Sequence, residues 1–171
     1  MDIKLINYKL YKGKYIVYET NGKGKEYDYD GELEFEGEYL NGKRNGKGKE
    51  YYENGKISFE GEYLNGENWN GKLYDPKNIN IYEIKNGQGH IKKYSSDGNL
   101  VFEGDYLNGK KNGIGKDYYN DELIFEGEYL NGKRWNGKEY NRDGFEYEIV
   151  EYLNGKKKII EKNNIFSEIF D

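Results

Sequence analysis

The chain has 171 residues, 17 % of them aromatic, and a net charge of −5, because 32 acidic and 27 basic residues are interleaved along it. With 24 glycines, 20 tyrosines and no alanine, this composition excludes a helical bundle and favours strands joined by turns. The interleaved charges exclude the basic surface of a nucleic-acid-binding protein, and the absence of cysteine excludes disulfides and thiolate chemistry.

The N-terminal stretch MDIKLINYKLYKGKY has no uninterrupted apolar segment. No other stretch approaches the roughly 20 apolar residues that are needed to span a bilayer. The lack of cysteine also agrees with a reducing compartment. We therefore expect a cytoplasmic protein, with a peripheral position at a membrane as the alternative.

An eight-residue motif defines the repeat unit. FEGEYLNG, or FEGDYLNG in one copy, begins at Phe35, Phe59, Phe102 and Phe125, so the copies start 24, 43 and 23 residues apart. A second half-unit of the NGxG type begins at Asn21, Asn45, Asn86 and Asn112. With degenerate units included, the pattern gives about seven units of 21–24 residues, nested in a super-repeat of about 65 residues.

Side chains alternate between faces in each predicted strand. In FEGEYL, Phe35, Gly37 and Tyr39 fall on one face, whereas the glutamates and Leu40 fall on the other. In GKGKEYY, the lysines alternate with the glycines in the same way. Antiparallel pairing would set glutamate against lysine, and it would place the aromatic rings over glycines that leave them room.

Twelve Asn-Gly pairs separate these runs, among them those that begin at Asn41, Asn65 and Asn131. Asn-Gly favours a hairpin turn because both residues tolerate a positive φ. A single hairpin is marginal in water, so successive hairpins must stack their aromatic rings into a row. The predicted fold class is all-β, an elongated single-layer antiparallel sheet of stacked β-hairpins.

The pattern (F/Y)EG(E/D)YLNGKxNGKGKxY, repeated at about 23 residues, resembles the MORN (membrane occupation and recognition nexus) repeat over roughly residues 12 to 158. This resemblance implies an extended, twisted sheet with an aromatic groove. It also implies a scaffold or dimerisation module, which in some members is proposed to bind phospholipid. Similar bacterial repeats occur in proteins described as antitoxins. We assign residues 1–162 to the repeat domain.

Residues 163–171 are expected to form a C-terminal cap or tail, because Ile165, Phe166, Ile169 and Phe170 have helical spacing. Two kinds of unit depart from the pattern. The units at Phe59 and Phe125 carry Trp69 and Trp135, 66 residues apart, and lose the second glycine of the GxG pair. Those near Tyr82 and Tyr147 lose the FEG start. We expect local bulges or altered curvature in these units, a regular sheet over residues 35–52 and 102–119, and perturbations after each tryptophan.

Residues that could carry chemistry have structural explanations. The Glu36/Glu38 pair recurs in every good unit, whereas catalysis by two carboxyls needs one site with distinct environments. His90 is the only histidine, which is too few for an ordinary metal site or a catalytic triad. No helix follows the GxG stretches to make a phosphate site. We expect no catalytic residue, cofactor or metal, and no enzyme activity.

The predicted function is a non-catalytic protein–protein interaction scaffold that uses an aromatic groove. The expected partner is a protein, a peptide or a second copy of the chain, and not a nucleic acid. Phospholipid binding, with the lysines at 156–158 as a possible contact, and an antitoxin-like role are alternatives. The partner-binding candidates are Tyr39, Tyr63, Tyr106, Tyr129, Trp69 and Trp135.

Overall fold

A computed structural model describes residues 6–11, 14–19, 21–77, 79–143 and 146–164, and in these it is all-β, with no helix. The first eight strands are β1 (Ile6–Tyr11), β2 (Lys14–Glu19), β3 (Gly22–Tyr27), β4 (Leu33–Leu40), β5 (Lys43–Tyr51), β6 (Ile57–Leu64), β7 (Glu67–Tyr74) and β8 (Ile81–Ile84). The others are β9 (Gly89–Tyr94), β10 (Leu100–Leu107), β11 (Lys110–Tyr119), β12 (Glu122–Leu130), β13 (Lys133–Asp143), β14 (Glu146–Leu153) and β15 (Lys156–Asn164).

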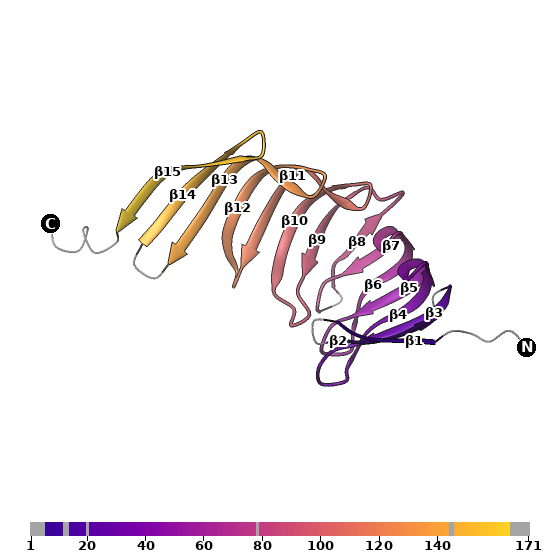
Figure 1. Ribbon diagram of the computed structural model, residues 1–171. Coiled ribbons are helices and arrows are strands. Elements are labelled where there is room, and N and C mark those ends of the chain that lie inside the picture. Colours follow the sequence, from indigo (N-terminus) through magenta and orange to yellow (C-terminus); the bar gives the residue numbers. More distant parts are fainter. Residues whose placement is uncertain (1–5, 12–13, 20, 78, 144–145, 165–171) are drawn as a thin grey trace, which may run out of the picture.

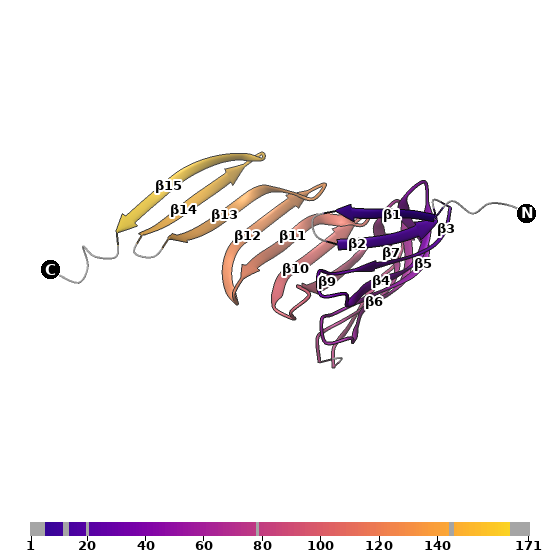
Figure 2. The same ribbon diagram turned by 60° about the horizontal axis from the view of Figure 1, so that its bottom comes forward.

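Within each of two sheets, every strand pairs antiparallel with its neighbours in the chain, which confirms the predicted stack of hairpins. The stack forms two sheets, β1 to β8 and β9 to β15, whereas one sheet was expected. Between them the ladder is reduced to a single bridge from Lys85 to Gln88. The strands follow one another in a row, with the first sheet strongly curled and the second more extended (Figures 1 and 2).

The junction falls in the degenerate unit that follows Trp69. Two backbone hydrogen bonds connect the two sheets through the turn at Gly87. The N–H of Gly87 donates to the carbonyl of Trp69 at 2.8 Å, and the N–H of Gly109 donates to the carbonyl of Gly87 at 2.9 Å. One hydrophobic cluster also continues across the junction, because Ile91 of the second sheet packs with the first sheet's core. The perturbation expected after Trp69 is therefore the break between the two sheets.

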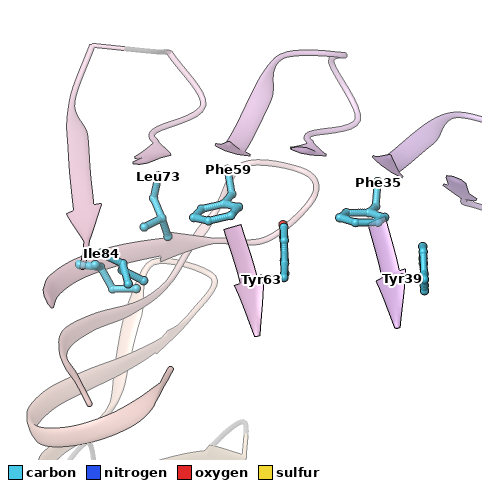
Figure 3. Close-up of a cluster of buried hydrophobic side chains, with 7 residues drawn as sticks. Phe35, Tyr39, Phe59, Tyr63, Leu73 and Ile84 are labelled. Carbon is cyan, nitrogen blue, oxygen red and sulfur yellow. The ribbon is translucent and has the colours of Figure 1, made fainter. Parts of the chain in front are cut away.

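Phenylalanine rings form the core on one face, which we call the aromatic face. Figure 3 shows the rings of Phe35 and Phe59 in one row, with Tyr39 and Tyr63 standing edge-on beside them. The Tyr63 ring lies 5.3 Å from Phe35 and 5.1 Å from Phe59, with interplanar angles of 86° and 81°. The four repeat phenylalanines are at most 1 % exposed. The same arrangement recurs in the second sheet around Phe102 and Phe125.

The phenylalanine rings lie over rows of paired glycines, as the sequence predicts. In the first sheet these rows consist of Gly24, Gly37, Gly48, Gly61 and Gly71, and in the second of Gly104, Gly115, Gly127 and Gly137. A Cβ atom at Gly48 would lie 2.7 Å from the Phe35 ring. Glycine is needed there because the ring rests directly on the backbone.

Only about half of the Asn-Gly pairs make the predicted turns. Turn asparagines such as Asn41 and Asn65 have φ values of 51° and 54° and connect adjacent strands. The second pair of a unit, such as Asn45-Gly46, lies inside a strand at a register shift. Its side chain has another role: Asn45 Oδ1 accepts a hydrogen bond from the backbone N–H of Asn65 at 3.2 Å. Four further pairs of asparagines link successive hairpins in the same way.

The tryptophan-bearing units keep the glycine that they were expected to lose. Gly71 pairs with Gly61 and carries the Phe59 ring, which is the position of Gly48 in the regular unit. Compared with the regular unit, this unit is one residue shorter at the bulge, where Trp69 is the single residue between Asn68 and Asn70. Bulges were expected in these units, and the register shift confirms them.

At the C-terminal end, β14 and β15 continue the second sheet beyond Trp135. Strand β15 extends to Asn164, two residues past the expected end of the repeat domain. The predicted cap, with Ile165, Phe166, Ile169 and Phe170, lies outside the described residues.

Candidate functional site

A hollow of about 930 Å³ lies on the first sheet, on the face opposite the phenylalanines, which we call the charged face. Side chains from β2 to β6 line it, and the glycines Gly37, Gly48 and Gly61 expose their backbone along its floor. We call this hollow the trough.

Two rows of alternating lysines and glutamates run across the strands of the trough. Cross-strand pairing defines the first row as Lys25, Glu36, Lys49 and Glu60. The second row consists of the pairs Lys23–Glu38 and Lys47–Glu62, which are joined at a bulge, where the backbone N–H of Lys47 donates to Glu38 Oε2 at 2.9 Å. Lys25 Nζ lies 3.2 Å from Glu36 Oε2, and Lys49 Nζ lies 3.1 Å from Glu60 Oε1. These pairs confirm the predicted apposition of glutamate and lysine. They are 38–51 % exposed, so they contribute little to stability and remain accessible to a partner.

The aromatic face carries a basic side chain over most of its phenylalanine rings. In the first sheet, the Arg44 guanidinium lies 4.0 Å from the centre of the Phe35 ring. It donates two hydrogen bonds of 2.8 Å to the carboxylate of Glu26 and one to Glu50. The Tyr39 hydroxyl donates to the same Glu26 carboxylate at 2.6 Å. This half-buried cluster closes the aromatic face above the ring.

The second sheet repeats this cluster with two basic residues. Arg134 lies over Phe125 at 4.5 Å, and the Lys111 ammonium lies over Phe102 at 4.2 Å. Both donate hydrogen bonds of 2.6 Å to the Asp117 carboxylate. Although burial opposes ionisation, the hydrogen bonds from Lys111 and Arg134 hold the pKa of Asp117 below its ordinary value.

These basic residues were not predicted as core residues. Arg44, Lys111 and Arg134 occupy the same place in three units, opposite the tyrosine of FEGEYL in the cross-strand register. In the fourth unit this place holds Asn68. The recurrence of a basic residue at this position in three of four units could have indicated its structural role. It was missed because the residue falls on the aromatic face only when the bulge is taken into account.

The four candidate tyrosines belong to this packed layer. Tyr39, Tyr63 and Tyr129 are only 6, 3 and 4 % exposed, and Tyr106 is half-buried. The structure thus corrects the expectation of an open groove lined by these rings, because phenylalanine rings and basic side chains fill the space around them. The hollow that the structure contains lies on the opposite face.

Trp69 and Trp135 pack against the turn of the following hairpin. A Cβ atom at Gly87 would lie 2.7 Å from the Trp69 ring, and one at Gly155 would lie 3.3 Å from the Trp135 ring. Each tryptophan carbonyl also accepts a hydrogen bond of 2.8 Å from the backbone N–H of that glycine. Both rings are half-buried, and they lie at the ends of the strands, away from the trough lining.

Two other sequence features lie elsewhere. Lys157, within the run of three lysines, donates a hydrogen bond of 2.7 Å to Glu139, whereas Lys156 and Lys158 are exposed. His90 is exposed on β9, where its Nδ1 lies 2.7 Å from Asp105 Oδ1. Among the residues that the structure describes, no three His, Asp or Glu side chains are grouped to hold a metal ion. None of the described segments is a helix that could cross a membrane.

Several fully or partly buried phenols have raised pKa values. Burial, followed by the hydrogen bond to Glu36, raises the pKa of Tyr51 to about 12. Burial also raises the pKa of Tyr94 to about 12. For Tyr39 and Tyr129, burial and then the carboxylates of Glu26 and Asp117 raise the pKa further.

Alkaline pH should therefore unfold the protein cooperatively. Because the folded pKa values exceed the unfolded value of about 10, these phenols stabilise the fold fully below about pH 10. That stabilisation is lost as pH rises toward about 12, the pKa of Tyr51 and Tyr94. We expect tyrosinate absorbance and the loss of β-sheet circular dichroism to follow one transition. Ionisation of most tyrosines with the sheet intact would contradict this prediction.

Comparison with known protein families matches residues 35–57 and 102–121 to the MORN repeat. These segments are the FEG strand and the strand that follows it in the two most regular units, β4–β5 and β10–β11. The resemblance seen in the sequence is thereby confirmed for these residues. No curated protein matches the chain.

Proposed function

We propose that this MORN-repeat protein is a non-catalytic interaction scaffold whose trough holds a segment of a partner protein. The observation that carries the proposal is the trough itself, a hollow of about 930 Å³ whose floor is glycine backbone and whose sides are accessible charges. A hollow of this size and openness suits a peptide segment or a protruding loop.

The charges of the trough favour recognition of a segment with both signs of charge. Positive and negative side chains alternate from strand to strand, so like charges recur at every second strand, about 9.6 Å apart. A partner of a single charge would meet repulsion at half of these positions. Complementary alternation would therefore provide specificity and orientation more than affinity.

A scaffold explains the recurrence of the carboxylates better than an enzyme does. Each glutamate of the rows faces a lysine, and the same environment returns in successive hairpins, as for Glu36 beside Lys25 and Glu60 beside Lys49. Acid–base catalysis requires two groups whose surroundings push their pKa values apart. Repetition of one environment is suited to holding an extended partner.

Site-specific photocrosslinking in the host that encodes the protein tests this proposal. A photoreactive amino acid replaces Glu38 or Lys47 in the trough, and Tyr119, which is 68 % exposed on the second sheet, serves as the control position. We expect one partner protein to be crosslinked from both trough positions and not from Tyr119. Lys49→Glu should reduce this crosslinking because it reverses a charge in one row.

The absence of any crosslinked protein from the trough, or equal crosslinking from Tyr119, would contradict the proposal. Retention of the crosslink in Lys49→Glu would show that the charge rows do not select the partner. Circular dichroism of each variant checks that the sheet is intact.

A further inference from the structure

The charged face of the second sheet carries an exposed apolar patch. Leu107 of β10, Ile114 of β11 and Leu130 of β12 are 39, 58 and 42 % exposed. Ile114 pairs with Glu128, so Leu130, two residues further along β12, is its diagonal neighbour. The backbone N–H of Ile114 donates to the Asp105 carboxylate at 3.2 Å, and Leu107 lies two residues after Asp105 on β10. We call these three residues the apolar patch.

The fold does not need an isoleucine at this position. The equivalent residue of the first sheet is Lys47, which pairs with Glu62 as Ile114 pairs with Glu128. The phenylalanine core lies on the opposite face. An isoleucine exposed over half of its surface, where a regular repeat unit carries lysine, therefore contributes little to the core. An exposed isoleucine with exposed leucines on both neighbouring strands favours an interaction site.

The patch continues along the hairpin turns. Leu153 of β14 precedes the next turn and is 64 % exposed, and between it and Leu130 the Trp135 ring packs against Gly155. The three leucines lie on alternate strands, about 9.6 Å apart for a strand spacing of about 4.8 Å. One heptad of an α-helix rises about 10.5 Å. A helix lying across the strands would present one apolar residue to each leucine.

Lysines border the patch at the turns. Lys110, Lys133 and Lys156 pair directly with Leu107, Leu130 and Leu153. All three lysines are exposed, and no ion pair involves them within the described part of the chain. On the inner side, the Asp105 carboxylate is engaged by His90, and Glu128 accepts a hydrogen bond of 2.7 Å from the Asn136 side chain. The charges paired with the leucines are therefore positive, whereas the two carboxylates flank Ile114.

We propose that the apolar patch, extended by Leu153, is the docking surface for an amphipathic α-helix of a partner protein. The helix lies across the strands, with its apolar side on the leucines and acidic residues toward Lys110, Lys133 and Lys156. An anionic membrane fits less well. A bilayer broad enough to cover Ile114 would also meet the carboxylates of Asp105 and Glu128, which flank it. This surface is separate from the trough.

The test uses the whole chain and a synthetic helical peptide. The peptide has about three heptads, with leucines along one side and glutamates beside them, and carries a fluorophore for anisotropy measurements. We expect saturable binding that Ile114→Lys weakens at least tenfold. Lys133→Glu should also weaken it, whereas a peptide with lysine in place of glutamate should bind poorly. Leu40→Lys, the equivalent of a patch leucine on the first sheet, is the matched control and should leave the affinity unchanged.

Since Lys47 occupies the equivalent position, Ile114→Lys should retain its circular dichroism and melting temperature. If Ile114→Lys nevertheless unfolds, the Lys133→Glu variant decides. Absence of saturable binding, or an equal loss in Leu40→Lys, would overturn the proposal. Binding to phosphatidylserine vesicles that Ile114→Lys abolishes, without binding of the peptide, would replace the helix with a membrane surface. Crosslinking from the trough is unaffected by these outcomes, so the two proposals fail separately.

Discussion

Replacing Phe59 with alanine should lower the free energy of unfolding by about 4 kcal/mol, the typical cost of removing a fully buried aromatic ring. Phe59 is 1 % exposed, and its ring lies on the paired glycines Gly61 and Gly71. Glycine has no side chain that could move into the space vacated by the ring. The unit also carries Asn68 where others place a basic residue over the ring, so little can collapse onto the cavity.

Urea denaturation followed by circular dichroism measures this loss. Leu64→Ala, at a residue of the same strand that is 39 % exposed on the charged face, is the control and should cost less than about 1 kcal/mol. Because a repeat protein can open locally, hydrogen exchange of β6 and β7 should show whether the loss stays near the mutation. A cost below that of Leu64→Ala would mean that the ring does not support the sheet.

The second large effect is expected for Gly61→Ala, which should lower the free energy of unfolding by about 3 kcal/mol because of overpacking. The added Cβ atom would lie 2.1 Å from the carbonyl oxygen of Asn70 and 2.6 Å from the Cα of Gly71. These are backbone atoms of the paired strand, so the strands would have to separate. The expected loss of stability comes from the close approach of the two strands. It does not come from backbone strain, because Gly61 is not in the left-handed region.

Gly55→Asn separates this clash from a general effect of removing glycine. Gly55 has a φ of 74°, and no atom lies within 4 Å of an added Cβ, whereas asparagine tolerates the left-handed conformation. The control should change the unfolding free energy by less than about 1 kcal/mol. Similar losses in both variants, measured by urea denaturation, would refute the role assigned to the glycine rows.

The all-β class, the hairpin stack and the cross-strand pairs could be predicted because they depend on local periodicity. Alternation along FEGEYL separates Phe35 from Glu36, and antiparallel pairing then brings Glu36 to Lys25 and Lys49. The position of the phenylalanine rings over glycines follows from the same alternation. Each of these inferences requires only the period of a strand and the length of a turn.

The candidate site was harder to predict because it depends on shape. Tyr39 and Tyr63 were assigned to a groove on the basis of their face alone, yet that face is filled by Arg44 and by neighbouring rings. The curl of the first sheet instead leaves its hollow on the charged face. Strand periodicity says which residues share a face, but it does not say which way the sheet bends.

By itself, the sequence determined the repeat unit, its strands, the pairing of glutamate with lysine and the family resemblance, because all of these are properties of short segments repeated at a fixed period. Only the tertiary structure decided the break between β8 and β9 and the face that is hollow. These features arise from small departures in successive units. Twist and curvature accumulate from strand to strand, so one missing residue in a bulge changes the geometry of the hairpins that follow.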